Sequence, residues 1–291
     1  MRKRFPDWLR REIPTGTTFA THETISEFKL NTVCESALCP NRVECFSRKT
    51  ATFMILGDIC TRRCGFCAIS VGKPMEVEED EPFRVAQAAK KLGLKHVVIT
   101  SVARDDLKDE GADAFFHTIT EVRQALPEST IEVLTPDFHA KSDLIKRVCD
   151  AHPNVFNHNI ETVERLSPLV RPQARYRRSL QVLEMIKSID PSIIAKSGLM
   201  LGLGETLDEV RQAFRDLKSA GCEIVTIGQY LKPLEGKLEI QEFVKPEIFD
   251  QLRDEGLAHG FREVYSGPYI RSSYHAGEAY ERSLKAESVL T

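Results

Sequence analysis

The sequence predicts an α/β fold in which a partial barrel of parallel strands lies between irregular N-terminal and C-terminal extensions. From residue 51 onward, short apolar runs alternate with amphipathic stretches, and six such strand–helix pairs can be counted. Repeated pairs of this spacing are typical of a parallel sheet with helices on its outside. Six pairs are fewer than a closed eight-stranded barrel needs, so we expect a partial (β/α)6 barrel.

Length and composition fit a fold of this size. The chain has 291 residues, of which 42% are hydrophobic and 29% are charged. A chain of this length can bury a sizeable core as one large domain. We expect three regions: an N-terminal extension at 1–50, the barrel at 51–265 and a C-terminal segment at 266–291.

The expected strands are short and rich in β-branched residues. In chain order they are TFMIL (52–56), HVVIT (96–100), TIEVLT (130–135), NVFNHN (154–159), IIAKSGLMLG (193–202) and EIVTIG (223–228). The segments between them have the apolar spacing of amphipathic helices. The clearest of these segments are 81–93, 111–126, 141–152, 175–189 and 206–221.

Each expected strand ends in a polar segment. These segments are 57–60, 100–106, 135–139, 157–162, 202–206 and 228–230. Because function gathers at the carboxyl ends of parallel strands, they predict one shared site on one rim of the sheet. The simpler alternative is that every strand end enters a polar loop.

Charge and the N-terminal sequence exclude several classes of protein. Lys and Arg total 40 against 43 Asp and Glu, a net charge of −3, so no basic footprint for nucleic acid is present. No apolar run has the length of a membrane span. The basic N-terminus lacks the apolar core of a secretory signal, and Asp7 and Glu12 make it a poor transit peptide. A cytoplasmic location is therefore expected.

Cysteine spacing is the most informative motif. Six of the 8 cysteines lie within residues 34–67. They form two triplets, C-x4-C-x5-C at Cys34, Cys39 and Cys45, and C-x3-C-x2-C at Cys60, Cys64 and Cys67. In a reducing compartment, clustered cysteines more often bind metal or act in catalysis than form disulfides. The remaining two, Cys149 and Cys222, are expected to be buried structural thiols.

The second triplet admits three interpretations. Its spacing could place three core thiols on one helix face, although Gly65 weakens a helix there. A zinc site usually takes four ligands, commonly in paired C-x2-C units, and this triplet does not divide into such pairs. Three thiolates on a short loop suit an iron–sulfur cubane in which one iron has no cysteine. The neighbouring Arg62 and Arg63 are expected to favour the thiolate form.

The segment CTRRCGFC (60–67) resembles the cysteine loop of the radical S-adenosylmethionine superfamily. That resemblance implies a radical SAM partial barrel whose first strand leads into the loop. It also implies that Cys60, Cys64 and Cys67 hold a catalytic [4Fe–4S] cluster, and that S-adenosylmethionine chelates the open iron. Phe66 would then lie against the adenine.

The same resemblance assigns cofactor contacts at other strand ends. Asn159 and Glu161 would bind the ribose hydroxyls, Thr100 and Ser101 would meet the methionine amino group, and Arg175 would bind the carboxylate. The alternative for Thr100 and Ser101 is ordinary strand-end hydrogen bonding. For Arg175 the alternative is a solvated helix start.

The first triplet could also be interpreted as a small zinc knuckle, or as thiols that cap the barrel. Its spacing fits no common zinc site. Together with the second triplet and RSSYHAG (271–277), it resembles the lipoyl synthase family over nearly the whole chain. The resemblance implies that Cys34, Cys39, Cys45 and a serine hold a second, auxiliary [4Fe–4S] cluster. Ser272 is the expected ligand, with a catalytic role, and Ser273 is the alternative. Taken alone, Ser272 would be read as a helix cap.

The implied reaction is insertion of two sulfur atoms at C6 and C8 of an octanoyl chain on a lipoyl carrier domain. The auxiliary cluster would donate the sulfur, with the N-terminal extension and the C-terminal segment closing around it. Implied partners are lipoyl domains of 2-oxoacid dehydrogenase E2 subunits or glycine cleavage H protein, a flavodoxin- or ferredoxin-type reductant, and iron–sulfur carrier proteins. One departure from the family pattern is Ala103, at a position that is usually acidic.

Three alternatives stand beside this interpretation. A biotin-synthase-like radical SAM enzyme would give the first triplet no role. A two-cluster electron carrier would normally saturate each cluster with cysteine, which these triplets do not allow. A zinc-stabilised binding module would contain zinc without iron or sulfide.

Overall fold

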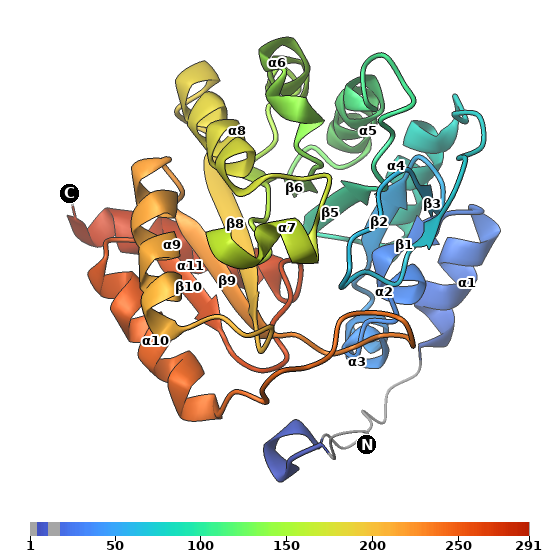
Figure 1. Ribbon diagram of the computed structural model, residues 1–291. Helices are drawn as coiled ribbons and strands as arrows, with labels where there is room; N and C mark the ends of the chain where they lie inside the picture. The colour runs from blue at the N-terminus through green and yellow to red at the C-terminus, as the bar shows by residue number, and fades with distance from the viewer. Residues whose placement is uncertain (1–4, 11–17, 291) are drawn as a thin grey trace.

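The computed structural model describes residues 5–10 and 18–290, and within them one eight-stranded sheet organises the fold (Figure 1). Its strand order is β1-β2-β5-β6-β7-β8-β9-β10, and a separate two-stranded sheet pairs β3 with β4. The strands are β1 (Asn31–Thr32), β2 (Thr52–Ile55), β3 (Ile59–Cys60), β4 (Ser70–Val71), β5 (His96–Ser101), β6 (Thr130–Leu134), β7 (Val155–Asn157), β8 (Ile194–Leu201), β9 (Ile224–Gln229) and β10 (Glu263–Ser266).

The helices include one after most strands and others in the two terminal regions. The α-helices are α1 (Phe19–Glu27), α2 (Val33–Ser36), α3 (Arg42–Ser47), α4 (Glu81–Leu92), α5 (Ala112–Ala125), α6 (Ser142–Cys149), α7 (Ser167–Val170), α8 (Tyr176–Ile189), α9 (Leu207–Ser219), α10 (Pro246–Ala258) and α11 (Ala276–Leu290). Short 3₁₀ turns lie at η1 (Asp7–Leu9), η2 (Phe138–Ala140) and η3 (Glu164–Leu166).

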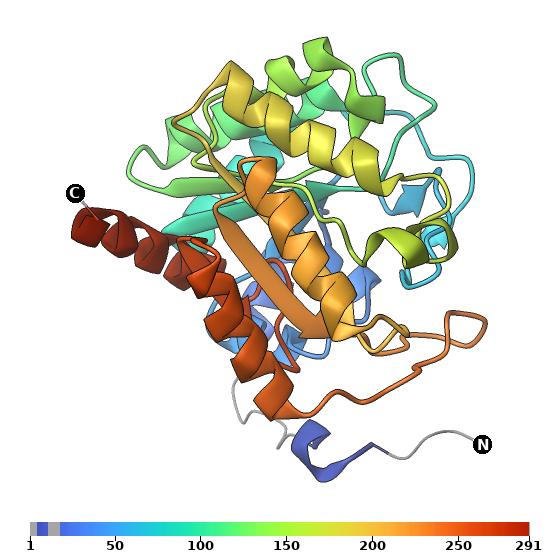
Figure 2. The same ribbon diagram turned by 60° about the vertical axis from the view of Figure 1, so that its left-hand side comes forward.

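The sheet is a partial barrel. Every pairing from β2 through β10 is parallel, and only β1, on the outer edge of β2, runs antiparallel. The edge strands β1 and β10 do not pair with each other, so the described sheet is open. Figures 1 and 2 show it curved, with the connecting helices on its outer face.

Alternation along the strands divides the core into two parts. In β5, Val97 and Ile99 are fully buried within the main hydrophobic cluster, which also includes apolar residues of the surrounding helices such as Phe115 and Ile119. The positions of opposite parity face the interior of the barrel. That interior holds a buried ion pair, in which Lys196 Nζ lies 2.8 Å from Glu132 Oε1.

The six expected strands are confirmed, each within two residues of its expected start, and so are the five clearest helices. The sequence missed β10, a four-residue strand whose burial is mixed, because a short EVYS run carries no clear period. Helices α1 and α3 lie in a region expected to be irregular. In α1 only Thr21, Thr24 and Ile25 are buried, so its apolar stripe is weak.

The two ends of the chain meet on one side of the barrel. Asn41 Nδ2 donates to the Tyr269 carbonyl at 2.7 Å, and Tyr274 Oη donates to Glu44 Oε1 at 2.9 Å. The hydroxyl of Tyr269 also donates to the Leu9 carbonyl at 2.6 Å. These bonds join segments more than two hundred residues apart in sequence.

Two further expectations concern burial. Cys149 is 1% exposed and Cys222 is fully buried, which confirms them as core thiols. Within the described chain, no helix combines the length and apolar character needed to cross a membrane. The basic residues 1–4, on which part of the targeting argument rests, lie outside the described residues.

Candidate functional site

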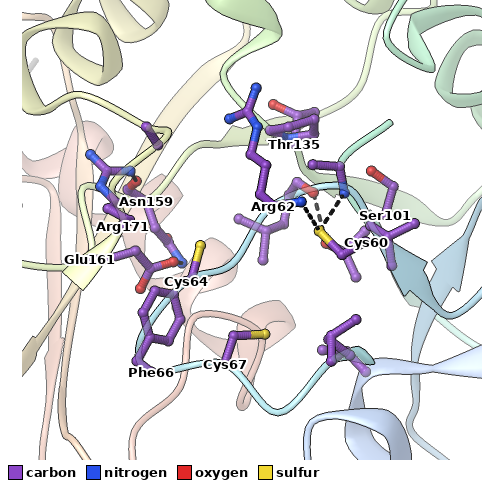
Figure 3. A pocket seen from close by; sticks show the side chains of 18 of the residues that line it. Cys60, Arg62, Cys64, Phe66, Cys67, Ser101, Thr135, Asn159, Glu161 and Arg171 are labelled. Atoms are coloured by element: carbon purple, nitrogen blue, oxygen red, sulfur yellow. Dashed lines mark hydrogen bonds between the residues drawn. The ribbon is translucent and has the colours of Figure 1, made fainter. Parts of the chain in front are cut away.

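A cavity of about 240 Å³ opens at the carboxyl ends of β2, β5, β6 and β7. Cys60, Cys64 and Cys67 all line it, and Figure 3 shows their sulfurs around one space. Four of the six polar strand ends contribute to its lining, as the sequence predicts. The two others, 202–206 and 228–230, do not.

The glycines of β8 and of the turn after it serve close packing within the protein. Gly202 has φ +95, and a Cβ there would lie 2.2 Å from Gln229 Nε2 and 2.4 Å from the Glu242 carbonyl oxygen. A Cβ on Gly198 would lie only 2.5 Å from Thr226 Oγ1. These glycines therefore let the protein's own segments pack closely.

The cysteine loop is held from several sides. Leu56 and Gly57 adopt positive φ values of 68° and 85°, which turn the chain out of β2. The Leu56 amide donates to the buried Glu81 carboxylate at 2.8 Å. Gly65 N donates to the Val170 carbonyl at 2.8 Å, and a Cβ on Gly65 would lie 2.9 Å from Leu238, so only glycine fits without displacing that side chain. The loop is thus anchored to the rest of the protein from several sides.

The environment of the sulfurs fits a polynuclear centre. Among the described residues, neither triplet brings three sulfurs within 4.8 Å of one another. A single tetrahedral zinc, with Zn–S bonds of about 2.3 Å, would hold them closer than that. Cys60 Sγ accepts hydrogen bonds from the amides of Arg62 and Ala103, both at 3.4 Å. Backbone donors to thiolate sulfur are a common feature of iron–sulfur sites.

Burial keeps the metal-free thiols of Cys64 and Cys67 protonated. Burial, with the neighbouring Cys67 and Glu161, raises the pKa of Cys64 to about 12. Burial also raises the pKa of Cys67. A bound metal would therefore have to displace these protons.

The sequence suggests that Arg62 favours the thiolate form of the cysteines. The structure instead pairs Arg62 with two carboxylates. Arg62 lies 2.6 Å from Asp105 and 2.7 Å from Asp137, so its charge is already balanced. Burial alone would raise the pKa of Asp137, but Arg62 and neighbouring cations hold it at about 2. The role of Arg62 is to tie the cysteine loop to the ends of β5 and β6.

Four buried polar atoms in the cavity lining have no hydrogen-bond partner among the described residues. They are Ser101 Oγ, Thr135 Oγ1, Asn159 Oδ1 and Arg171 Nε. Buried polar atoms in folded proteins are nearly always satisfied, so four orphans around one cavity indicate a polar ligand. Their mixture of donors and acceptors suits a molecule with hydroxyl and charged groups.

Glu161 and Arg171 form the charged side of the cavity. Glu161 has φ +63, and its backbone bridges to Leu199 of β8, which turns its side chain toward Asn159. Asn159 Nδ2 donates to Glu161 Oε1 at 3.1 Å. Burial raises the pKa of Glu161, and Arg171 opposes that shift. Figure 3 shows both side chains beside Cys64 and Phe66.

His158 forms the wall behind this charged pair. Its Nδ1 lies 2.9 Å from the Thr135 carbonyl and its Nε2 lies 2.8 Å from Ser179 Oγ. Burial, helped by Arg171, lowers the pKa of His158 to about 4, so the ring is neutral near neutral pH.

Most of the expected cofactor residues lie together, with two qualifications. Phe66, Thr100, Ser101, Asn159 and Glu161 all line the cavity. However, the Thr100 hydroxyl donates to the Leu134 carbonyl at 2.8 Å, the ordinary strand-end bond that was its alternative.

Arg175 does not join these residues, because its side chain is exposed at the N-cap of α8. Sequence reasoning missed Arg171, which is 3% exposed and lines the cavity. Its only signal was its position between the polar end of β7 and the α8 start.

The first triplet lies beside the sheet edge, where the chain ends meet. Burial raises the pKa of Cys34 to about 11 and, with the nearby Cys34 and Cys39, that of Cys45 to about 12. The Cys34 and Cys39 thiols therefore lie near Cys45. The half-buried Arg271 guanidinium lies near Cys39, and burial lowers its pKa while Cys39 opposes the shift.

Ser272 is not the helix cap that its sequence context allows. Helix α11 begins at Ala276, and Ser272 lies in the turn before it. Ser273 lies next to it, and its side chain lines a second cavity together with Cys45.

Comparisons with known proteins agree with the geometry. The model of the radical SAM superfamily matches residues 54–217. The model of the N-terminal domain of lipoyl synthase matches residues 1–39. The radical SAM match includes Cys60, Cys64 and Cys67, and the lipoyl synthase match includes Cys34 and Cys39.

Full-length relatives are similarly consistent. The chain is 52% identical to a lipoyl synthase of Rubrobacter xylanophilus, covering 95% of this chain and 86% of the relative. It is 51% identical to one of Caldanaerobacter subterraneus, covering 95% and 97%. Among solved structures, methylornithine synthase matches with a TM-score of 0.55 at 15% identity, covering 82% of this chain and 73% of that one. This last likeness shows the fold alone.

Proposed function

The chain belongs to the lipoyl synthase family of the radical S-adenosylmethionine superfamily, and from this premise we propose that it inserts two sulfur atoms, at C6 and C8, into an octanoyl chain on a lipoyl carrier domain. Membership of the superfamily implies one [4Fe–4S] cluster and S-adenosylmethionine. The sites of insertion, the second cluster and the individual residue roles are parts of the proposal.

Cys60, Cys64 and Cys67 are the proposed ligands of the radical cluster. When bound, the cluster and S-adenosylmethionine together supply a 5′-deoxyadenosyl radical that can take hydrogen from an unactivated carbon. The three thiols support this role because they line one cavity. The two amides that point at Cys60 Sγ would stabilise its thiolate.

The orphaned polar atoms support the cofactor assignments. Asn159 and Glu161 would bind the ribose hydroxyls, and Ser101 would accept from the methionine amino group. We assign the methionine carboxylate to Arg171 in place of Arg175, because Arg171 is the buried guanidinium in the cavity. Phe66 would pack against the adenine.

The rest of the cavity is suited to an alkyl chain. Its lining includes the apolar side chains Val33, Met54, Ile69, Val71, Val102 and Leu134. These exclude water from the reacting carbon, which protects a radical from side reactions. Val33 also adjoins Cys34, so an acyl chain in this cavity would reach toward the first triplet.

Cys34, Cys39 and Cys45, with Ser272 or Ser273, are the proposed ligands of the auxiliary cluster, which donates sulfur when bound. The observation that carries the proposal is that the second triplet lines a cavity with apolar walls, and that this lining also includes Val33, the residue before Cys34. A serine oxygen is a harder ligand than a thiolate, so its bond to iron would be the easiest to lose.

The proposed substrate is an octanoylated lipoyl domain, either of a 2-oxoacid dehydrogenase E2 subunit or of glycine cleavage H protein. A flavodoxin- or ferredoxin-type protein would supply electrons, and iron–sulfur carrier proteins would restore the consumed cluster. A biotin-synthase-like activity is the second candidate, and it would not need Cys34, Cys39 and Cys45.

The test is a single-turnover experiment under anaerobic conditions. Protein reconstituted with iron and sulfide is mixed with S-adenosylmethionine, a strong reductant and an octanoyl-lysine peptide. Mass spectrometry follows 5′-deoxyadenosine and the peptide. A variant with all three of Cys34, Cys39 and Cys45 changed to alanine is run in parallel.

We expect the peptide to gain two sulfurs with the wild-type protein only. If the triple variant adds sulfur as well, the auxiliary-cluster assignment is wrong. If 5′-deoxyadenosine forms but no peptide gains sulfur, the substrate assignment fails while the radical half stands. Neither product from protein that holds two clusters would favour an electron carrier.

A further inference from the structure

The loop that joins β9 to α10 forms part of the wall of the first cavity. This β9–α10 loop spans residues 230–245 and is drawn in orange in Figures 1 and 2. Within it, the Leu238 amide donates to the Gly65 carbonyl at 3.0 Å, and the Tyr230 hydroxyl donates to the Leu238 carbonyl at 2.8 Å. The β9–α10 loop is therefore fastened directly to the segment that carries the second triplet.

The residue before Leu238 brings a positive charge into the cavity. Lys237 is half-buried and lines the cavity together with Cys67. Burial raises the pKa of the Cys67 thiol, and the Lys237 charge opposes that shift. Within the part of the chain that the structure describes, the Lys237 ammonium forms no ion pair and no hydrogen bond. Its charge is thus available to a group that occupies the cavity.

Two arginines also line the cavity, and both are already engaged. Arg62 is paired with two carboxylates. Arg171 donates to the Asn159 carbonyl at 2.8 Å and to Ser179 Oγ at 2.7 Å, and it is the proposed partner of the methionine carboxylate. Lys237 therefore differs from both arginines, because its charge has neither an ion-pair partner nor an assigned role.

Lys237 is placed to act on the cluster proposed for the second triplet, because charge close to an iron–sulfur cluster helps to set its reduction potential. Thiolate ligands make such a site negative, and every electron added makes it more so. A nearby cation therefore stabilises the reduced cluster more than the oxidised one, which raises the potential. This effect is stronger in a partly closed cavity than in water, because the effective dielectric constant is lower there.

We propose that Lys237 raises the reduction potential of the cluster on Cys60, Cys64 and Cys67, and so eases its reduction by a flavodoxin- or ferredoxin-type protein. The inference rests on the proposed function, to which it adds a residue that governs electron entry. One electron passes from that protein to the cluster. The electron donor is oxidised, the cluster is reduced, and no covalent bond of the chain forms or breaks.

Three single substitutions separate the charge of Lys237 from its place in the structure. Lys237→Gln removes the charge and keeps a polar side chain, whereas Lys237→Arg keeps the charge. Lys245→Gln is the matched control, because Lys245 is an exposed cation of the same β9–α10 loop that does not line the cavity. Leu238, which fastens the loop to Gly65, is unchanged in all three.

The reduction potential is measured by a redox titration followed by EPR spectroscopy. Each protein is full length, with Cys34, Cys39 and Cys45 replaced by alanine so that one cluster gives the signal, and S-adenosylmethionine is left out. Binding of S-adenosylmethionine to the same proteins is measured separately by anaerobic equilibrium dialysis. Single-turnover sulfur insertion by the wild-type chain, with both triplets intact, is recorded beside them.

We expect Lys237→Gln to lower the ratio of reduced to oxidised cluster about tenfold at a fixed solution potential, equivalent to about 59 mV for one electron. Lys237→Arg and Lys245→Gln should match the wild-type ratio. An equal fall in Lys237→Arg would overturn the proposal, because it would mark a structural role.

An unchanged potential in Lys237→Gln would also overturn it. If that variant then binds S-adenosylmethionine more weakly than wild type, Lys237 is a cofactor ligand instead. If the potential falls as expected but the wild-type chain adds no sulfur, the proposed function fails and the role of Lys237 in reduction stands.

Discussion

The loop that carries Cys60, Cys64 and Cys67 is fixed by the barrel itself, whereas Cys34, Cys39 and Cys45 lie where the two ends of the chain meet. Around the second triplet, the anchors come from strand ends of the barrel and from the helices that follow its strands, and they include Glu81, Val170 and the Arg62 ion pairs. Around the first, the anchors include side-chain bonds between residues 41–48 and 269–275.

Under the proposed function, this difference matches rigidity to the task of each triplet. A cluster that makes radicals repeatedly benefits from a loop in which many contacts fix the positions of its ligands. A cluster that must be dismantled and rebuilt benefits from ligands on segments held by a few bonds. Such segments open locally at lower free energy than the core of a sheet.

The largest expected effect distinguishes the roles of the two triplets. Cys64→Ala should abolish both 5′-deoxyadenosine and sulfur insertion, because it removes a ligand of the cluster on which all later steps depend. Cys45→Ala should still form 5′-deoxyadenosine while sulfur insertion is lost. Both products are measured by mass spectrometry in one turnover. Loss of 5′-deoxyadenosine in Cys45→Ala would show that the triplets do not act separately.

A second prediction concerns the ion pairs of the rigid loop. Arg62→Gln leaves Asp137, which is fully buried, without its closest cation. Removing one partner of a buried pair typically costs about 3 kcal/mol or more, so we expect a loss of about 3 kcal/mol in unfolding free energy. Urea unfolding of the metal-free protein measures it. Arg63→Gln, at the exposed neighbour, should change stability by about 0.5 kcal/mol or less.

A third prediction concerns the contact between the chain ends. Tyr274→Phe removes the hydrogen bond to Glu44, and a bond to a charged group at a half-buried position contributes about 1.5 kcal/mol. We expect iron to be lost faster from the first triplet's cluster, while the other cluster keeps its iron. Chelator-challenge kinetics report both. Tyr280→Phe is the control, and equal loss of iron from both clusters would contradict the assignment.

The last prediction is a pH dependence of stability at the rigid site. His158 has a folded pKa of about 4 against about 6.5 when unfolded, so the unfolded state binds more protons between these values. Stability should therefore rise with pH from 4 to 6.5, by at most about 1.4 kcal/mol per pH unit. His158→Gln should flatten this slope in urea unfolding measured across the window. An unchanged slope would mean that His158 is not buried as a neutral ring.

The rigid half of the molecule could be predicted from sequence because its signals are local. Six strands and the helices between them follow from periodicity, and the spacing of Cys60, Cys64 and Cys67 marks the loop. Even Ala103, which departs from the family pattern, serves the site through its backbone. Its amide donates to Cys60 Sγ, and its carbonyl accepts from Thr61.

The remaining features could not be predicted because they depend on contacts across the fold. Whether Arg171 or Arg175 faces the cavity is decided by where the chain leaves α7 and enters α8, and both look alike in a run of arginines. The pairing of β10 and the meeting of Glu44 with Tyr274 join distant segments without a motif. The second cavity has no sequence signal at all, since three separate segments form it.

The most direct test of sulfur donation by the auxiliary cluster is Mössbauer spectroscopy of iron in the protein before and after one turnover. Spectra of variants that lack either triplet assign the signals of the two clusters. We predict that the signal of the cluster on Cys34, Cys39 and Cys45 declines in proportion to sulfur inserted, while that on Cys60, Cys64 and Cys67 persists. Full product with both signals unchanged would contradict the account, because the sulfur would then have another source.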